Sequence, residues 1–218
     1  MTNITREVQR FLDHDLSAKR DLARGLINTR ALAVYLKKHL GSEGSIDAII
    51  SAIRRYESGE KEEERFSKAR ALIKNAKIST KTGIAIVSLV KDAEVQQQLP
   101  RLFSLVQYER GELIRLIQAE ESIKVIVDEK NIGKVTELFK RGKIQNINKN
   151  LAELNMRLTE ISAKVPGVLA LLDTELASND VNIVETCSCV PEILWFLSQK
   201  DLLKAHKTFL DLIEAIKK

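Results

Sequence analysis

The sequence predicts an α+β protein in which a small all-α region precedes two copies of one α+β module with an antiparallel sheet. Three observations predict this. Residues 1–57 carry helix-cap residues and apolar positions at helical spacing. Residues 83–218 alternate segments typical of strands with segments typical of helices. This second region also matches itself when the chain is shifted by 70 positions, which indicates a duplication.

The first 57 residues predict four helices and a helical domain. Ser17, Thr29 (or Asn28) and Ser45 stand where an N-cap is required, and Gly25 ends the second helix. The predicted helices cover residues 4–13, 17–24, 29–39 and 45–57. Residues 18–36 have the proportions of a helix-turn-helix module, with a short glycine turn between two helices.

Two interpretations of this helical domain remain open. In the first it binds DNA, with Arg30 at a base edge and Lys37 and Lys38 at phosphates. In the second it is a packing or dimerisation domain. Residues 1–57 contain ten basic and seven acidic residues, and this small positive surplus does not decide between DNA binding and a packing role.

Residues 58–80 are predicted to form a linker helix. The segment opens with a charged run, 58–65, whose carboxylates favour a helix N-terminus. Phe66, Ala69 and Ile73 then lie on one face.

The repeat divides the remainder into residues 81–147 and 148–218. Residues 123–134 fall on residues 193–204 without a gap. The same shift pairs apolar residues over about 55 positions. These pairs are Ile84 with Leu154, Ile86 with Met156, Val95 with Val165, Leu99 with Leu169, and Phe139 with Phe209.

Each copy is predicted to run strand, helix, strand, strand, helix. In the second copy the elements are strand 151–158, helix 165–177, strands 182–189 and 192–198, and a helix from about residue 200. In the first copy the strands are 84–90, 112–119 and 123–128. Pro100 predicts that the first helix of that copy starts only near Leu99. A short strand near 143–147 either closes the first sheet or begins to cross to the second. A β-α-β-β-α-β order gives a ferredoxin-like antiparallel sheet with helices on one face.

Three short motifs of the second copy resemble a known family. Residues 166–168 (Pro-Gly-Val) open the helix, residues 181–183 (Val-Asn-Ile) open the next strand, and a hairpin and a helix follow. In this spacing the segment is similar to the ACT domain, in particular to the C-terminal regulatory half of aspartate kinases. The resemblance implies tandem ferredoxin-like ACT modules that bind amino acids, or other small metabolites, at a domain interface. Nothing in the chain resembles the kinase half.

The second copy is where we expect ligand binding. Gly167 exposes backbone N–H groups at a positive helix end, which suits a carboxylate, and Asn182 can donate and accept. The expected ligand-binding residues are Thr159, Ser162, Val165, Pro166, Gly167, Val168, Asn182 and Ile183. The structural alternative is that Gly167 allows close packing and Asn182 caps a turn. The first copy is degenerate, because Gln96-Gln97 replaces Pro-Gly and Glu112 replaces the asparagine.

Enzyme, metal and cofactor sites are not expected. The chain has no glycine-rich phosphate loop and no Ser/His/Asp order that the fold would gather. Cys187 and Cys189 are too close in sequence for an unstrained bridge, and the three histidines are scattered. No apolar run has the length of a membrane span, and the N-terminus lacks a signal peptide, so a cytoplasmic protein is expected.

Two functional hypotheses follow. In the first, a homodimer or higher homo-oligomer senses an amino acid and passes the signal to a DNA-binding helical domain. In the second, the chain is a non-catalytic regulatory or scaffold subunit of an amino-acid biosynthetic enzyme such as aspartate kinase. A net charge of +5 permits DNA as a partner without requiring it.

Overall fold

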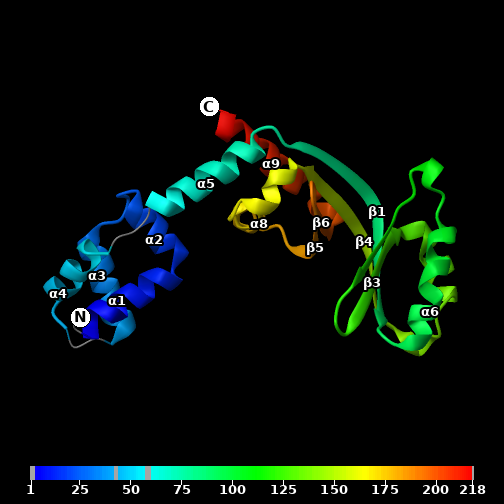
Figure 1. The fold of residues 1–218 in the computed structure, drawn as a ribbon, viewed down its shortest axis with the longest axis horizontal. Helices are drawn as coiled ribbons and strands as arrows, with labels where there is room; N and C mark the ends of the chain where they lie inside the picture. Colours follow the sequence, from blue (N-terminus) through cyan, green and yellow to red (C-terminus); the bar gives the residue numbers. More distant parts are fainter. Residues whose placement is uncertain (1–2, 42–43, 57–59, 218) are drawn as a thin grey trace. The chain divides into compact units, whose positions relative to one another are not determined.

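The computed structural model describes residues 3–41, 44–56 and 60–217 and contains two compact units, Met1–Ala69 and Arg70–Lys218 (Figure 1). Helix α5 (Glu60–Ile73) includes the boundary between them. In the described ranges, no helix is long and apolar enough to cross a membrane.

The first unit contains four helices before α5: α1 (Asn3–His14), α2 (Leu16–Ala23), α3 (Thr29–Leu40) and α4 (Ile46–Arg54). All four lie where the sequence predicts them, although α4 ends at Arg54 and the predicted end at residue 57 lies outside the described residues. The N-caps at Asn28 and Ser45 are confirmed, because their side chains accept backbone N–H groups of the first turns of α3 and α4. The predicted cap at Ser17 is wrong. Asp15 caps α2 instead, accepting from the N–H of Ala18 at 2.8 Å.

These helices enclose one apolar core. Each contributes the face that its spacing predicts, and the fully buried members come from α1, α3 and α4. They are Val8, Leu12, Leu32, Ala33, Leu36, Ile49, Ala52 and Ile53. Gly25 allows the turn between α2 and α3 because its φ is +68°, which a residue with a side chain adopts at a cost.

The second unit is built on one antiparallel sheet of six strands in the order β2-β3-β1-β4-β6-β5. The strands are β1 (Lys77–Val90), β2 (Ile114–Gln118), β3 (Ser122–Asp128), β4 (Ile144–Arg157), β5 (Ile183–Cys189) and β6 (Glu192–Ser198). The helices are α6 (Ala93–Leu102), α7 (Ile132–Glu137), α8 (Val168–Ser178) and α9 (Leu202–Lys217). Short 3-10 helices are η1 (Phe103–Leu105), η2 (Tyr108–Arg110), η3 (Glu129–Asn131), η4 (Arg141–Lys143), η5 (Glu160–Lys164) and η6 (Gln199–Asp201).

Strands β1 and β4 are at least twice as long as the others and each serves two parts of the sheet (Figure 1). Residues 84–90 of β1 pair with β3, whereas residues 77–81 pair with the end of β4. Residues 151–157 of β4 pair with β6. We call β2, β3, α6, α7 and the adjoining parts of β1 and β4 the first half, and β5, β6, α8, α9 and the remaining parts of β1 and β4 the second half.

Four expectations about these elements change. The predicted linker helix over residues 58–80 is too long, because α5 ends at Ile73 and β1 begins at Lys77. The predicted strands near 143–147 and at 151–158 are one strand, β4, which therefore both closes the first half and opens the second. Helix α6 begins at Ala93 rather than near Leu99, because Asp92 caps it and Pro100 is accommodated near its last turn. Helix α8 begins at Val168, so Pro166 precedes the helix instead of lying in its first turn.

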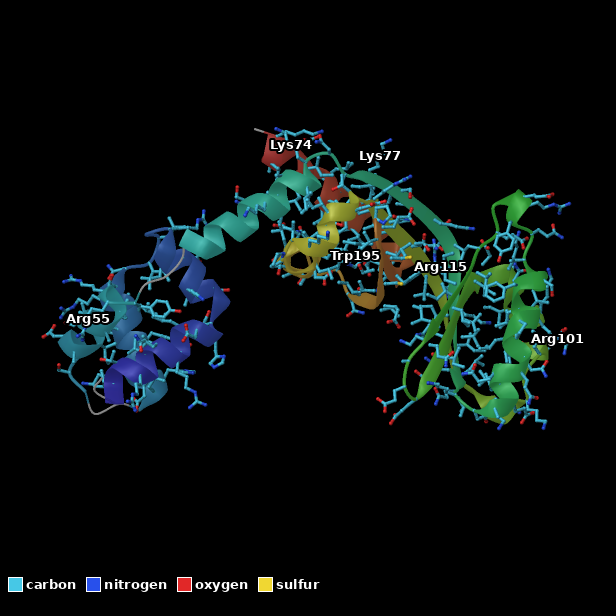
Figure 2. The ribbon with its side chains drawn as sticks, viewed as in Figure 1. Arg55, Lys74, Lys77, Arg101, Arg115 and Trp195 are labelled. Atoms are coloured by element: carbon cyan, nitrogen blue, oxygen red, sulfur yellow. The ribbon has the colours of Figure 1, made fainter. Side chains whose placement is uncertain are left out.

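Each half has its own core, and a third cluster joins them. In the second half Trp195 is fully buried (Figure 2). It packs edge-on against Phe209 at 5.0 Å between ring centroids and donates its indole N–H to Asp173 at 2.7 Å. The shared cluster takes residues from β1 and β3 as well as from β4 and β6. Its buried members are Ile84, Ile86, Ile126, Leu151, Leu194 and Phe196.

Candidate functional site

The loop between β4 and α8 holds most of the residues expected to bind a ligand. Thr159 precedes η5 and its carbonyl accepts the N–H of Ser162 at 3.0 Å, and the carbonyl of Ser162 accepts the N–H of Val165 at 3.3 Å. Gly167 then stands at the N-cap of α8 with φ of +94°. The loop is tied to the β5–β6 turn, because the N–H of Leu158 donates to the carbonyl of Pro191 at 2.8 Å.

The first turn of α8 has no side-chain cap. Its N-cap is a glycine, and Pro166 beside it is exposed while Gly167 is half-buried. Val168 points into the core with 4% of its surface exposed. A helix N-terminus carries N–H groups without intrahelical partners and a partial positive charge, so this turn can accept an anionic group from outside the helix.

Asn182 and Ile183 lie at the other end of α8. The helix has 11 residues and so spans about 16 Å. The chain then returns through Val181, whose N–H donates to the carbonyl of Leu176 at the end of the helix. A helix that connects two parallel strands runs the length of the sheet, so the loop before it and the strand after it lie at opposite ends. Within one chain the structure therefore does not bring Asn182 to the Gly167 turn.

Strand β5 is the outer strand of the sheet on this side. Glu192, the first residue of β6, pairs with Cys189 at the end of β5 on one side and with Arg157 at the end of β4 on the other. The ends of β4 and β5 therefore lie at the same level of the sheet. The β4–α8 loop thus begins at the level of the β5 C-terminus. If a second copy added its β5 antiparallel to this edge, its Ile183 and Asn182 would come to this level, beside the loop.

The corresponding helix of the first half is capped differently. Asp92 accepts the N–H of Val95 at 2.9 Å through Oδ1, and its Oδ2 lies 2.5 Å from Nζ of Lys143. The contact with Lys143 and the hydrogen bond from Val95 lower the pKa of Asp92, and the carboxylate in turn raises the pKa of Lys143. In α6, a carboxylate of the chain itself occupies the helix end.

No protein-family model matches this sequence, and no curated protein matches it. Solved structures do match. The aspartate kinase of Clostridium acetobutylicum, described as an allosteric enzyme, aligns with a TM-score of 0.50 at 16% identity, over 62% of this chain and 34% of that one. The ligand-free regulatory subunit of aspartate kinase from Thermus thermophilus aligns with a TM-score of 0.50 at 14% identity, over 62% of this chain and 95% of that one.

The fold resembles the regulatory region of aspartate kinases. The resemblance to these ACT-domain regions, without the kinase domain, is thereby confirmed at the level of the fold. This chain spans about a third of the Clostridium enzyme.

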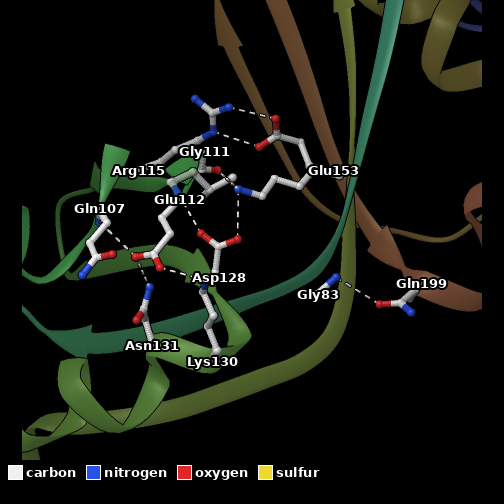
Figure 3. A network of polar contacts seen from close by, with 12 residues as sticks. Gly83, Gln107, Gly111, Glu112, Arg115, Asp128, Lys130, Asn131, Glu153 and Gln199 are labelled. Atoms are coloured by element: carbon white, nitrogen blue, oxygen red, sulfur yellow. Dashed lines mark hydrogen bonds and ion pairs between the residues drawn. The ribbon is translucent and has the colours of Figure 1, made fainter. Parts of the chain in front are cut away.

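Glu112, which the 70-residue repeat sets against Asn182, is committed to internal contacts (Figure 3). Its Oε2 accepts the N–H of Gln107 and the side-chain amide of Asn131, both at 2.9 Å, and its Oε1 lies 2.8 Å from Nζ of Lys130. The contact with Lys130 contributes most to lowering the pKa of Glu112 to about 2. Sequence reasoning missed this role, since it depends on the loop at Gln107, the 3-10 helix η3 and the segment before β2 meeting in space.

The expected DNA-contact residues lie on α3 of the first unit. Arg30, Lys37 and Lys38 are all exposed, and the helix buries Leu32, Ala33 and Leu36 on its opposite side. Tyr35 and His39 stack on each other with ring centroids 5.4 Å apart, and both rings lie edge-on to Phe11 of α1. The structure thus leaves the three basic side chains accessible and does not itself identify a partner.

A cavity of about 680 Å³ lies between α1, the start of α2 and the end of α3. It is lined by Glu7, Arg10, Phe11, His14, Asp15, Ser17, His39 and Leu40. These side chains carry both signs of charge, so the cavity indicates no ligand class. Among the described residues there is also no group of three or more His, Cys, Asp or Glu side chains that could hold a metal ion.

Proposed function

We propose that this chain is a non-catalytic regulatory protein that binds an α-amino acid at an interface formed by its ACT-like second half. One observation carries the proposal. The N-terminal turn of α8 is capped by Gly167 and by no side chain, whereas the equivalent turn of α6 is filled by Asp92. The similarity to aspartate kinase regulatory regions supports the fold on which this site depends.

The ligand would use both charged groups of an amino acid. Its carboxylate would accept N–H groups of the first turn of α8, where the helix dipole favours a negative charge. The hydroxyls of Thr159 and Ser162 stand in the same loop and can accept from an ammonium group. Val165, Pro166 and Val168 would form the rim.

A second copy would complete the site. Antiparallel pairing of β5 with the β5 of another chain would place that chain's Asn182 and Ile183 beside the β4–α8 loop. The eight expected residues would then come from two chains, six from one and two from the other. A homodimer is therefore part of the proposal.

The functional division of the chain is also proposed. Residues 1–57 would form the helical output domain, and the linker, predicted over residues 58–80, would end before β1 begins at Lys77. Residues 81–147 and 148–218 would be two ferredoxin-like ACT modules, of which the first is degenerate. Each module would use one strand of the other, because β1 and β4 are shared.

Two outputs remain candidates. In one, ligand binding changes how the helical domains of a dimer present Arg30, Lys37 and Lys38 to DNA. In the other, the chain is a regulatory subunit of an amino-acid biosynthetic enzyme such as aspartate kinase. The second is favoured by the alignment with 95% of a chain described as the regulatory subunit of aspartate kinase from Thermus thermophilus.

The test of ligand binding is a thermal-shift screen of the twenty amino acids at millimolar concentration. At concentrations well above Kd a bound amino acid should stabilise the protein by about 1–3 kcal/mol. Gly167→Asp places a carboxylate at the helix end and should abolish the shift. Gly167→Asn imposes the same backbone strain without the charge, so this variant should retain more of the ligand-induced Tm shift. If none of the twenty changes the Tm of the unsubstituted protein, the proposal is wrong.

The test of the output is fluorescence anisotropy with a random DNA duplex at low ionic strength. Binding that weakens with salt, and weakens further in Lys37→Gln/Lys38→Gln, supports the DNA output. Absence of binding at low salt eliminates that output and leaves the enzyme-subunit alternative.

A further inference from the structure

We propose that the first half contains a built-in occupant, in which the side chains of Asp92 and Lys143 fill the position that a free amino acid takes in the second half. We call these two residues the internal pair. The inference rests on the proposed function and deepens it, since it limits each chain to one ligand position.

The internal pair presents the same chemical groups as an amino acid. Oδ1 of Asp92 accepts the N–H of Val95 at 2.9 Å, which is how a ligand carboxylate would bind the first turn of a helix. An ammonium group, Nζ of Lys143, lies 2.5 Å from the other carboxylate oxygen. A carboxylate on helix amides with an ammonium beside it is the arrangement expected of a bound zwitterion.

Neighbouring charges hold the internal pair in place. Nζ of Lys143 also lies 3.4 Å from Glu94, and Glu94 is itself paired with Lys140 at 2.8 Å. The side chains of Asp92 and Lys143 are 31% and 28% exposed, so the pair is partly shielded from water. Lys143 ends η4, directly before β4, and thus joins the N-terminus of α6 to the strand that both halves share.

The second half has no such pair at the matching positions. Ile84 in β1 and Leu151 in β4 occupy equivalent positions, because they stand opposite Asp128 and Ser198, which are 70 residues apart. The predicted pairing of Ile84 with Leu154 is therefore wrong for these two strands. At the helix that follows, Asp92 directly precedes α6 and Gly167 directly precedes α8. Lys143 precedes β4 as Ala76 precedes β1. Neither Gly167 nor Ala76 carries a charge, so only the first half supplies its own carboxylate and ammonium at these positions.

Small solutes can reach both members of the internal pair, because the side chain of Asp92 is 31% exposed and Lys143 lines a cavity. A cavity of about 350 Å³ between α6 and the segment after α7 is lined by Glu94, Val95 and Lys143, among others. If a variant removes a member of the pair, a small ion of the same chemistry can therefore replace it from solution.

The experiment is chemical rescue measured by Tm in the full chain. Asp92→Gly removes the carboxylate and leaves at the cap the residue that α8 has, and Lys143→Met removes the ammonium. Loss of the carboxylate cap should lower the Tm by about 2–4 °C. Sodium acetate should restore part of this loss in Asp92→Gly, and methylammonium chloride should do so in Lys143→Met. Each is compared with sodium chloride at equal ionic strength.

The matched control is Ser45→Gly, which removes the cap of α4, where the side chain of Ser45 accepts the N–H of Ala48. Acetate should not restore the Tm of this variant beyond the effect of sodium chloride. Equal restoration in Ser45→Gly and Asp92→Gly, or none in either, would show that Asp92 is an ordinary helix cap and would overturn the inference.

Binding stoichiometry gives a second, independent readout. An amino acid that shifts the Tm of the unsubstituted protein should bind with one ligand per chain in calorimetry, and with two in the Asp92→Gly/Lys143→Met double variant. A normal response of the unsubstituted protein with no rescue and no second site overturns this inference alone. Absence of any response in the unsubstituted protein overturns the proposed function, and the inference with it.

Discussion

At the scale of single residues, a buried carboxylate shows how one side chain can organise three segments. Glu112 is 9% exposed and accepts hydrogen bonds from the loop before it and from Asn131, while it pairs with Lys130. Asp128 acts in the same way nearby, accepting the N–H of Leu113 at 2.7 Å and pairing with Lys81 at 2.9 Å (Figure 3). The contacts of Glu112 favour its charged form, and its pKa falls to about 2.

The first prediction concerns the pH dependence of this contact. The pKa of Glu112 is about 2 in the folded protein and about 4.3 in an unfolded chain. The stabilisation is therefore complete above pH 4.3 and is lost as the pH falls from there toward 2. Glu112→Gln should unfold at lower urea concentration than the unsubstituted protein at pH 7, and the difference should shrink steadily below pH 4.3. A difference that stays constant down to pH 2.5 would contradict the assigned contacts.

At the scale of elements, β1 and β4 depend on two residues with positive φ. Gly83 has φ of +67° and Asn150 has φ of +55°, and each directly precedes the point where its strand joins the other half. The N–H of Gly83 donates to Gln199 at 3.1 Å, and the N–H of Asn150 donates to Glu129 at 2.9 Å. Glu129 and Gln199 are 70 residues apart, so the repeat places equivalent side chains at both bends.

The second prediction tests the bend in β1. Gly83→Ala should lower the free energy of unfolding by about 1–2 kcal/mol, because a left-handed conformation is unfavourable for a residue with a Cβ. Steric overlap is not the cause, since no atom lies within 4 Å of the position that a Cβ would take at Gly83.

The matched control is Gly133→Ala in α7, where φ is not positive and the Cβ position is equally open. This substitution should raise stability by about 0.5–1 kcal/mol, as expected for alanine in a helix. Urea unfolding of both variants provides the measurement. Similar changes in both would show that the bend at Gly83 carries no strain.

At the scale of the second unit, the two halves are joined by more than their shared strands. The guanidinium of Arg115 in β2 donates two hydrogen bonds of 2.8 Å to the carboxylate of Glu153 in β4 (Figure 3). Lys124 in β3 pairs with Glu185 in β5. An apolar cluster shared by the two halves adds to these pairs. We therefore expect the halves to unfold together.

The third prediction concerns the Arg115–Glu153 pair. Arg115→Gln should lower the free energy of unfolding by about 1–3 kcal/mol, because Glu153, which is 5% exposed, would lose its charged partner. Arg101→Gln is the control, since Arg101 is exposed and its side chain bonds Gln98 on the same helix, and it should change stability by less than about 0.5 kcal/mol. Equal effects in urea unfolding would show that the Arg115 contact adds nothing.

The fourth prediction uses the single tryptophan as a probe of cooperativity. Trp195 lies in the core of the second half, and Val125 is fully buried in the core of the first. Val125→Ala should lower the stability reported by Trp195 fluorescence by about 2 kcal/mol, although the two residues belong to different cores. Leu36→Ala in the first unit should leave that fluorescence transition unchanged. If Val125→Ala leaves it unchanged as well, the halves fold independently.

Much of the secondary structure could be predicted from the sequence, because local signals carry it. The caps at Asn28 and Ser45, the hairpin of the second copy and its strand 192–198 all depend on residues close together in the chain. The predicted start of α6 is wrong because Asp92 caps the helix eight residues before Pro100, and the helix accommodates the proline near its end. The site was predicted only in part. Residues 159–168 are contiguous, whereas Asn182 is separated from them by the length of α8.

The sequence by itself determined that the chain has helices followed by a repeated α+β pattern, since periodicity and the 70-residue repeat are properties of the letters alone. Only the tertiary structure decided that β1 and β4 are shared, that Asn182 and Gly167 lie at opposite ends of α8, and that Asp92 meets Lys143. The physical reason is that strand pairing and ion pairing join residues about 50 or more positions apart. The packing of the whole unit sets which distant segments pair, and no local sequence pattern encodes that choice.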